Sequence, residues 1–211
     1  MSSAEIKRVF AGCLVGLLTV GALHAHDRGC EVHTFYSLVE ARAADHACVD
    51  TLIIADVDSF PDLCEFQNLK FLWIRNHTIK SISPKQLECL RKLEVLKVNY
   101  GLLRTFSIGE VCPRLQELSL SQNKLDSIMG PFDQLAHLRI LKLTNNPVKY
   151  VDIRQILKLK NLTELALYGD HGDAPFFNAE QQAEIAGVLS NCTIWFEPPL
   201  PYIRPTSAER K

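Results

Sequence analysis

The chain has 211 residues, of which 47% are hydrophobic, and its formal net charge is −1. This length suffices for one domain with a continuous core but not for two sizeable domains. A nearly neutral charge gives no electrostatic reason to expect a nucleic acid or an anionic membrane as a partner.

Residues 1–25 have the three parts of a secretory signal peptide. A basic pair, Lys7 and Arg8, precedes an apolar run of 15 residues that ends at Leu23, and Ala25 is a small residue suited to cleavage. The alternative is an uncleaved membrane anchor, which needs about 20 apolar residues. The sequence therefore predicts a secreted, extracellular protein with no membrane span.

Residues 26–48 lack the leucine spacing that begins at residue 49, so we expect them to form an N-terminal cap on the first spaced unit. Cys30 and Cys48 bracket this segment. We expect a disulfide between them because both lie in one small cap and an oxidising compartment preserves such bonds.

Residues 49–177 carry a repeated pattern, L-x-x-L-x-L-x-x-N-x-L-x-x-I, which is clearest between Leu115 and Val151. Units begin at residues 49, 69, 93, 115, 138, 162 and, in degenerate form, 189, so their spacings are 20, 24, 22, 23, 24 and 27 residues. The pattern resembles the leucine-rich repeat, whose units span about 20–29 residues. The resemblance implies an α/β solenoid: a leucine-rich-repeat horseshoe with a parallel β-sheet on its concave face and short helices or 3₁₀ turns on its convex face.

The x-L-x-L-x part of each unit alternates with period two, so Leu118 and Leu120 should point into the core while their neighbours point outward. One unit cannot bury its leucines alone and must stack on another. The Asn that follows, such as Asn123, can satisfy backbone groups in the turn at the strand end. His77 and Gly101 take this place in two earlier units.

The outward positions of the first three strands are unusually apolar. Ile53, Phe71, Trp73 and Val95 would form a patch edged by Arg75, Lys97 and Tyr100. Apolar patches that contain Trp, Tyr and Arg are typical of binding hot spots. We therefore predict that a protein partner binds this part of the concave face. The alternatives are that the N-terminal cap folds over the patch or that a homodimer hides it.

Cys64, Cys89 and Cys112 lie shortly before the starts of three consecutive units, on the convex side. Neighbouring repeats stack about 4.8 Å apart, and a disulfide needs Cα atoms within about 7 Å. A bond is feasible between Cys64 and Cys89 or between Cys89 and Cys112, and we favour Cys64–Cys89. Cys192 occupies a core leucine position of the last unit, where we expect a free buried thiol, the alternative being an intermolecular bond.

Three N-x-[S/T] sequons begin at Asn76, Asn161 and Asn191. In a secreted chain we expect a glycan on at least one of them.

The C-terminal part reads as a second cap over residues 178–197. Asn178 and Gln181 match a capping box at the start of a helix that reaches Leu189. A last strand should follow over residues 193–197. Residues 198–211 contain four prolines and should form a loose tail.

No residue pattern indicates catalysis or metal binding. The seven histidines do not cluster at ligand spacing, and the chain lacks paired cysteines at zinc spacing, a nucleophile elbow and a glycine-rich phosphate loop. We predict no enzyme activity, no cofactor and no metal site.

The signal peptide, about six repeats and the cysteine-bearing cap resemble the short secreted leucine-rich-repeat proteins of insects, especially the mosquito leucine-rich immune proteins. Longer members carry a C-terminal coiled coil, which the prolines from Pro198 to Pro205 prevent here. The resemblance implies a non-catalytic recognition protein of innate immunity that binds a protein ligand, as a single chain, a homodimer or a hetero-complex. The alternative is a structural or adhesion protein of the extracellular matrix or cell surface.

Overall fold

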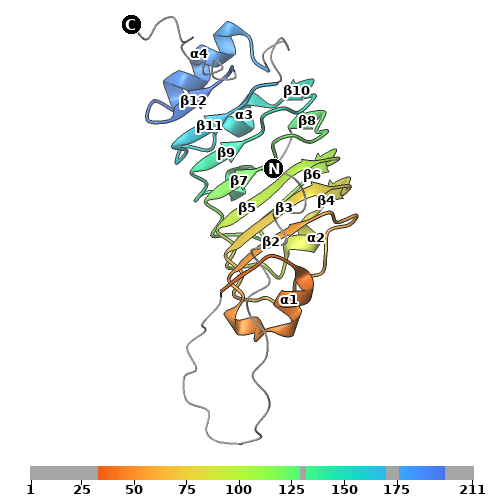
Figure 1. The fold of residues 1–211 in the computed structure, drawn as a ribbon. Coiled ribbons are helices and arrows are strands. Elements are labelled where there is room, and N and C mark those ends of the chain that lie inside the picture. The colour runs from red at the N-terminus through yellow and green to blue at the C-terminus, as the bar shows by residue number, and fades with distance from the viewer. Residues whose placement is uncertain (1–32, 129–131, 170–175, 198–211) are drawn as a thin grey trace, which may run out of the picture. The chain divides into compact units, whose positions relative to one another are not determined.

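The structure is a computed structural model that describes residues 33–128, 132–169 and 176–197, all within one compact unit, Glu31–Lys211. These residues contain a parallel sheet of eight strands, in the order β1-β2-β3-β5-β7-β9-β11-β12 (Figure 1). The strands are β1 (Thr34–Phe35), β2 (Thr51–Ala55), β3 (Phe71–His77), β5 (Val95–Gly101), β7 (Glu117–Ser119), β9 (Ile140–Lys142), β11 (Glu164–Ala166) and β12 (Thr193–Trp195). The predicted leucine-rich-repeat solenoid is confirmed.

The chain between these strands returns through short elements. Two small parallel pairs are formed by β4 (Ser81–Ile82) with β6 (Thr105–Phe106), and by β8 (Ser127–Ile128) with β10 (Tyr150–Val151). The helices are α1 (Leu38–Ala43), the 3₁₀ turn η2 (His46–Cys48), α2 (Pro84–Leu87), the 3₁₀ turn η3 (Phe132–Gln134), α3 (Ile153–Ile156) and α4 (Ala179–Val188). In Figure 1, α1 lies at the β2 end of the stack and α4 at the β12 end.

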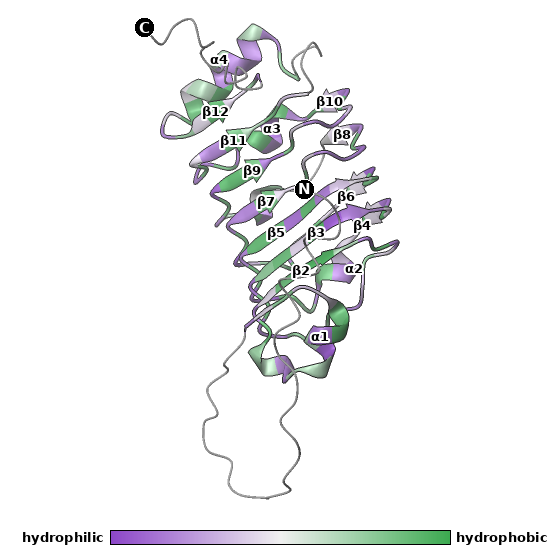
Figure 2. Ribbon diagram, viewed as in Figure 1, coloured by the Kyte–Doolittle hydropathy of each residue, from purple (hydrophilic) through white to green (hydrophobic). Residues whose placement is uncertain are grey.

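The repeat leucines set the register of the sheet. One row of mutually aligned core residues is Leu52, Leu72, Leu96, Leu118, Leu141 and Leu165. Each of them is at most 1% exposed, and hydrophobic residues mark the strands throughout the stack (Figure 2). The residues between them point to the other side of the sheet, which we call the open face and which corresponds to the predicted concave face.

The predicted register of the last repeat is wrong by two residues. Ile194, and not Cys192, aligns with Leu165. A shift of two residues keeps every side chain on the same side of a strand. The hydrophobic alternation could not reveal it, and Cys192 is half-buried instead of fully buried.

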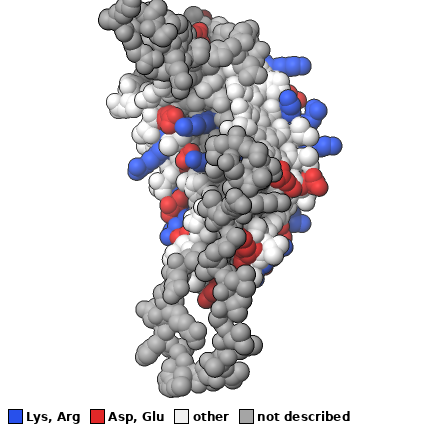
Figure 3. Space-filling view, viewed as in Figure 1, with Lys and Arg blue, Asp and Glu red and all other residues white. Residues whose placement is uncertain are grey.

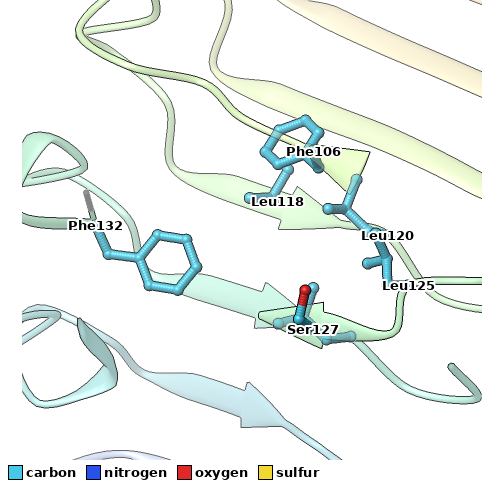
Figure 4. Close-up of a pocket in the computed structure, with 7 residues that line it drawn as sticks. Phe106, Leu118, Leu120, Leu125, Ser127 and Phe132 are labelled. Carbon is cyan, nitrogen blue, oxygen red and sulfur yellow. The ribbon is translucent and has the colours of Figure 1, made fainter. Parts of the chain in front are cut away.

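The core between the repeats is apolar and continuous from Ala41 to Leu189. Figure 4 shows part of it, where the leucines and Phe132 of one repeat meet Phe106 and Leu143 of the two neighbouring repeats around a small cavity. The lining residues are Phe106, Leu118, Leu120, Leu125, Ser127, Phe132 and Leu143. Full burial of a leucine contributes about 1.5–3 kcal/mol, so stacking of such units holds the fold together.

The strand ends turn at the same place in five successive repeats. The turning residues have positive φ values between 50° and 61°, and they are Asp56, Asn76, Tyr100, Gln122 and Asn145. Asn and Asp tolerate this left-handed conformation better than other non-glycine residues. The next residue is the asparagine position of the repeat, so the turn aims that side chain back into the stack.

Asn123 and Asn146 use this position to connect neighbouring repeats. The Asn123 amide donates to the carbonyl oxygens of Val98 at 2.7 Å and Leu120 at 3.0 Å, and its oxygen accepts from the Leu103 N–H at 3.1 Å. Asn146 makes the equivalent bonds one repeat further along. Buried backbone groups at the turns are satisfied in this way.

The described part of the N-terminal cap, residues 33–48, extends the sheet. Thr34 of β1 aligns with Thr51 of β2, so β1 lies beside β2 as the edge strand and not over β3. Cys48 is disulfide-bonded, while Cys30, its predicted partner, lies outside the described residues together with the predicted signal peptide.

The C-terminal cap begins as the sequence predicts. The Gln181 N–H donates to Asn178 Oδ1 at 2.9 Å, and the Asn178 N–H donates to Gln181 Oε1 at 3.0 Å. This reciprocal capping box fixes the start of α4. The last strand, β12, ends at Trp195, two residues earlier than predicted, and the predicted tail of residues 198–211 lies outside the described residues.

Candidate protein-binding face

The open face consists of side chains in rows that run across the strands. The middle row, set by the strand register, is Ile53, Trp73, Lys97, Ser119, Lys142, Ala166 and Trp195. The row before it is Thr51, Phe71, Val95, Glu117, Ile140, Glu164 and Thr193. Apolar and aromatic residues therefore predominate on β2, β3 and β5, and charged or small residues, together with Ile140, follow on β7, β9 and β11.

The structure brings the predicted apolar residues together. Ile53 and Trp73 are partners in neighbouring strands, and so are Phe71 and Val95. All four are half-buried, whereas their outward positions in the sequence predict an exposed patch. Neighbouring side chains in adjacent strands are about 5 Å apart and shield one another. We call Ile53, Phe71, Trp73 and Val95 the aromatic patch.

Two cations lie over the rings of the aromatic patch. The guanidinium carbon of Arg75 is 5.5 Å from the centre of the Trp73 ring, and the Lys97 Nζ is 5.6 Å from the centre of the Phe71 ring. Such contacts stabilise by about 0.5–1 kcal/mol at exposed sites. They also hold both cations beside the patch, at the edge predicted from the sequence.

Two ion pairs that were not predicted from the sequence cross the open face. Lys97 Nζ is 2.8 Å from a carboxylate oxygen of Glu117, and Lys142 Nζ is 2.9 Å from one of Glu164. Each pair is diagonal, since Lys97 aligns with Ser119 and Lys142 with Ala166. Alignment of the repeats by their leucines would have predicted that each lysine lies close to the glutamate of the next strand.

Tyr100 lies at the rim, where the backbone turns near the end of β5. It is 53% exposed, and its φ of 61° is unusual for an aromatic residue. Left-handed backbone costs a residue with a Cβ about 1–2 kcal/mol. The repeat imposes this conformation at Tyr100, and its ring is thereby presented to solvent.

His77 and Gly101 occupy the asparagine position of two consecutive repeats, and they depend on each other. His77 is only 2% exposed and aligns with Gly101 of the next strand. A Cβ atom on Gly101 would lie between 2.2 and 2.5 Å from three atoms of the His77 ring. The imidazole therefore fills the space that two asparagine side chains would share.

The buried position of His77 makes the stability of the fold depend on pH. Burial lowers the pKa of His77 below its ordinary value of 6.5, by more than an approach to the Ile79 backbone raises it. That approach does not complete a hydrogen bond, so neither ring nitrogen has a partner within the described residues. The folded state therefore favours the neutral ring. The contribution of the neutral His77 ring to the free energy of unfolding is therefore fully present above pH 6.5. It is lost as the pH falls through the lowered pKa.

Urea unfolding at pH 7.5 and pH 5.0 checks this expectation. The free energy of unfolding of the wild type should fall between the two pH values by more than that of His77→Asn. His137 is exposed, and His137→Asn should keep the dependence of the wild type. Identical pH dependence in wild type and His77→Asn would contradict the assignment to His77.

The three predicted glycosylation sites are all exposed but have different surroundings. Asn76 lies where the backbone turns near the end of β3, and Asn191 lies just before β12. The Asn161 amide donates to the Ala136 carbonyl oxygen at 2.7 Å, as Asn68, which is in no sequon, does to that of Ala47 at 2.8 Å. Asn161 thus has a structural role between repeats, and glycosylation at all three stays a prediction.

Two of the described cysteines bond to each other in the segments that connect successive strands of the sheet. Cys64 and Cys89 form a disulfide with Cα atoms 5.0 Å apart, which is the pair favoured from the sequence. Cys112 and Cys192 are free thiols. Burial raises the pKa of Cys112 to about 12 and that of Cys192 to about 11, so both thiols stay protonated at neutral pH.

The described ranges contain no group of three His, Cys, Asp or Glu side chains that could hold a metal ion. Within them, no helix combines the length and apolar character that crossing a bilayer requires. On the part of the surface visible in Figure 3, basic and acidic side chains are interspersed.

The known proteins to which this chain is similar in sequence include leucine-rich-repeat proteins. The chain is 30% identical over 114 residues to leucine-rich repeat-containing G-protein coupled receptor 5 of Rattus norvegicus, which covers 54% of the chain and 13% of the receptor. It is 31% identical over 126 residues to lumican of Rattus norvegicus, which covers 47% of the chain and 37% of lumican. The chain thus spans a minor part of each relative.

A solved structure gives the same result. A leucine-rich-repeat protein of Leptospira interrogans matches 69% of the chain and 36% of its own length, with a TM-score of 0.55 and 26% identity. No family model matches the chain. The repeat register, the parallel sheet and these relatives together identify the described chain as a leucine-rich-repeat solenoid.

Proposed function

We propose that the chain is a non-catalytic, secreted recognition protein that binds a protein partner through the open face of its repeats. The aromatic patch carries the proposal, since Trp73 and its apolar neighbours lie together with Arg75 and Lys97 at their edge. Interface hot spots are enriched in Trp, Tyr and Arg, and their centres exclude water. The relatives, which include a receptor, are compatible with a binding role.

Photo-crosslinking tests the proposal. A benzoylphenylalanine at Tyr100, which is exposed at the rim of the open face, should crosslink one protein of extracellular fluid. The same group at Lys85, exposed on helix α2, is the matched control. The Tyr100 adduct should be competed by unmodified protein and should disappear in Trp73→Ala. An adduct that forms equally from Lys85, or that survives Trp73→Ala, contradicts the proposal.

Loss of binding in Trp73→Ala must be separated from loss of the fold. Trp73 is half-buried, so its removal should cost less than the about 3–5 kcal/mol measured for a fully buried Trp. Urea unfolding of the variant checks this. A cost in the fully buried range would mean that Trp73 supports the core instead of a partner.

Innate immunity is the setting that we propose for this binding, on the resemblance of the sequence to the short insect immune proteins. The second candidate is structural or adhesive binding in the extracellular matrix. Release from expressing cells of a chain that lacks the predicted signal peptide, residues 1–25, would test secretion. A mass increase removed by glycosidase would test glycosylation. Recovery of the crosslinked partner from body fluid after infection favours the immune role, and constant recovery from matrix extracts favours the other.

A further inference from the structure

We propose that the aromatic patch and Arg75 recognise a protein segment in which an acidic side chain lies beside a large apolar side chain. The carboxylate binds Arg75, and the apolar side chain packs on Trp73 and Ile53. This inference rests on the proposed function and specifies the partner of that same site.

Arg75 differs from the other cations on the strands of the open face. Lys97 and Lys142 already contact carboxylates at 2.8 and 2.9 Å. No carboxylate within the described residues forms an ion pair with Arg75, which is exposed and is held over the Trp73 ring. A guanidinium stacked on a ring keeps its N–H donors free in the plane, where they match the two oxygens of a carboxylate.

The apolar partner of this cation lies next to it on the same strand. Arg75 and Trp73 are two residues apart in β3, which separates their Cα atoms by about 7 Å. Ile53 is the partner of Trp73 in β2, so the apolar contact extends over two strands. A matching segment presents its acidic and apolar side chains at a similar distance, two residues apart in a strand or three to four apart in a helix.

The charges on this part of the open face favour such a segment over a polyanion. Glu117 neutralises Lys97, so among the described residues of the aromatic patch and its edge Arg75 remains the cation without a paired carboxylate. Sulfated glycans and nucleic acids are bound by clusters or stripes of basic residues. A single carboxylate with an apolar neighbour satisfies Arg75 and covers the aromatic patch together.

A random 12-residue peptide library displayed on phage, selected on the full chain and depleted on Trp73→Ala, tests the inference. Enriched peptides should contain Asp or Glu within four residues of Trp, Phe or Leu. A fluorescent synthetic copy of the most enriched peptide then gives dissociation constants. Arg75→Glu should weaken binding about tenfold to a hundredfold, as expected for loss of a charge-assisted contact. Arg75→Lys should weaken it less, and Thr144→Ala, on the far part of the face, should leave it unchanged.

A charge exchange provides the decisive control. Peptides in which the acidic residue is replaced by Lys should bind Arg75→Glu better than they bind the wild type. Basic peptides in the enriched pool, acidic peptides indifferent to Arg75→Glu, or no Trp73-dependent peptide at all would each overturn the inference. Competition by heparin fragments that depends on Arg75 would also overturn it, in favour of a polyanion. Sedimentation showing a dimer that Arg75→Glu dissociates would overturn it in favour of a second copy.

Failure of the inference and failure of the proposed function can be told apart. If the Tyr100 crosslink persists and depends on Trp73 while Arg75→Glu has no effect, the open face binds a protein of different chemistry. If the crosslink itself is absent, the proposed function fails as well.

Discussion

Gly101→Asn is expected to destabilise the fold by about 3 kcal/mol, at the upper end of the range for overpacking a core. The new Cβ would lie between 2.2 and 2.5 Å from atoms of the His77 ring. The ring is buried between the repeats and has no room to move away. Urea unfolding gives the difference in free energy. Gly187→Asn is the matched control, since nothing lies within 4 Å of a Cβ there, and it should change stability by about 0.5 kcal/mol or less.

The double variant His77→Asn/Gly101→Asn should recover most of this loss. Two asparagine side chains would then continue the hydrogen bonds that Asn123 and Asn146 make in later repeats. The coupling free energy between the two positions should reach about 2–3 kcal/mol, as found for residues in direct contact. Additive effects of the two single substitutions would show that His77 does not occupy the space of the missing side chain.

Asn123→Ala is expected to cost about 3 kcal/mol, because one substitution leaves two buried groups without their partner. The backbone N–H of Leu103 and the carbonyl oxygen of Val98 lose their bonds to Asn123, while the Leu120 carbonyl keeps its bond from Asn146. Each unsatisfied buried group costs about 1–3 kcal/mol, with some relief from relaxation. Hydrogen exchange at the Leu103 amide should accelerate together with the loss of global stability.

Ser121→Ala is the control for Asn123→Ala. Ser121 is half-buried on the open face, so its loss should change stability by about 0.5 kcal/mol or less. Equal costs for the two substitutions would mean that Asn123 does not bind the backbone of the preceding repeat.

The leucine spacing predicts most of the architecture because burial imposes one register on stacked repeats. Leu118 and Leu141 align where the spacing places them. The last repeat is different, since Cys192 and Ile194 have the same parity and both satisfy the alternation. Only the hydrogen bonds of β12 to β11 separate these two registers.

The binding surface on the open face is harder to predict from the sequence than the fold. Outward positions follow from the alternation, so the residues of the aromatic patch and Arg75 can be predicted. How far they are buried depends on neighbours in adjacent strands. The dependence of His77 on Gly101 cannot be predicted from single repeats. Each residue merely replaces the usual asparagine in its own repeat, and only the alignment of the two strands shows that they are neighbours.

The position of the disulfide determines the order in which the molecule can come apart. Each repeat contacts only its neighbours, so unfolding progresses from the ends. Cys64–Cys89 ties two early repeats together, and Cys48 is also bonded, whereas the described cysteines of the later repeats, Cys112 and Cys192, are free. Loss of structure should therefore begin at β12 and move toward β7. A partly unfolded molecule would keep the strands that carry Trp73, so recognition would outlast the far half of the sheet.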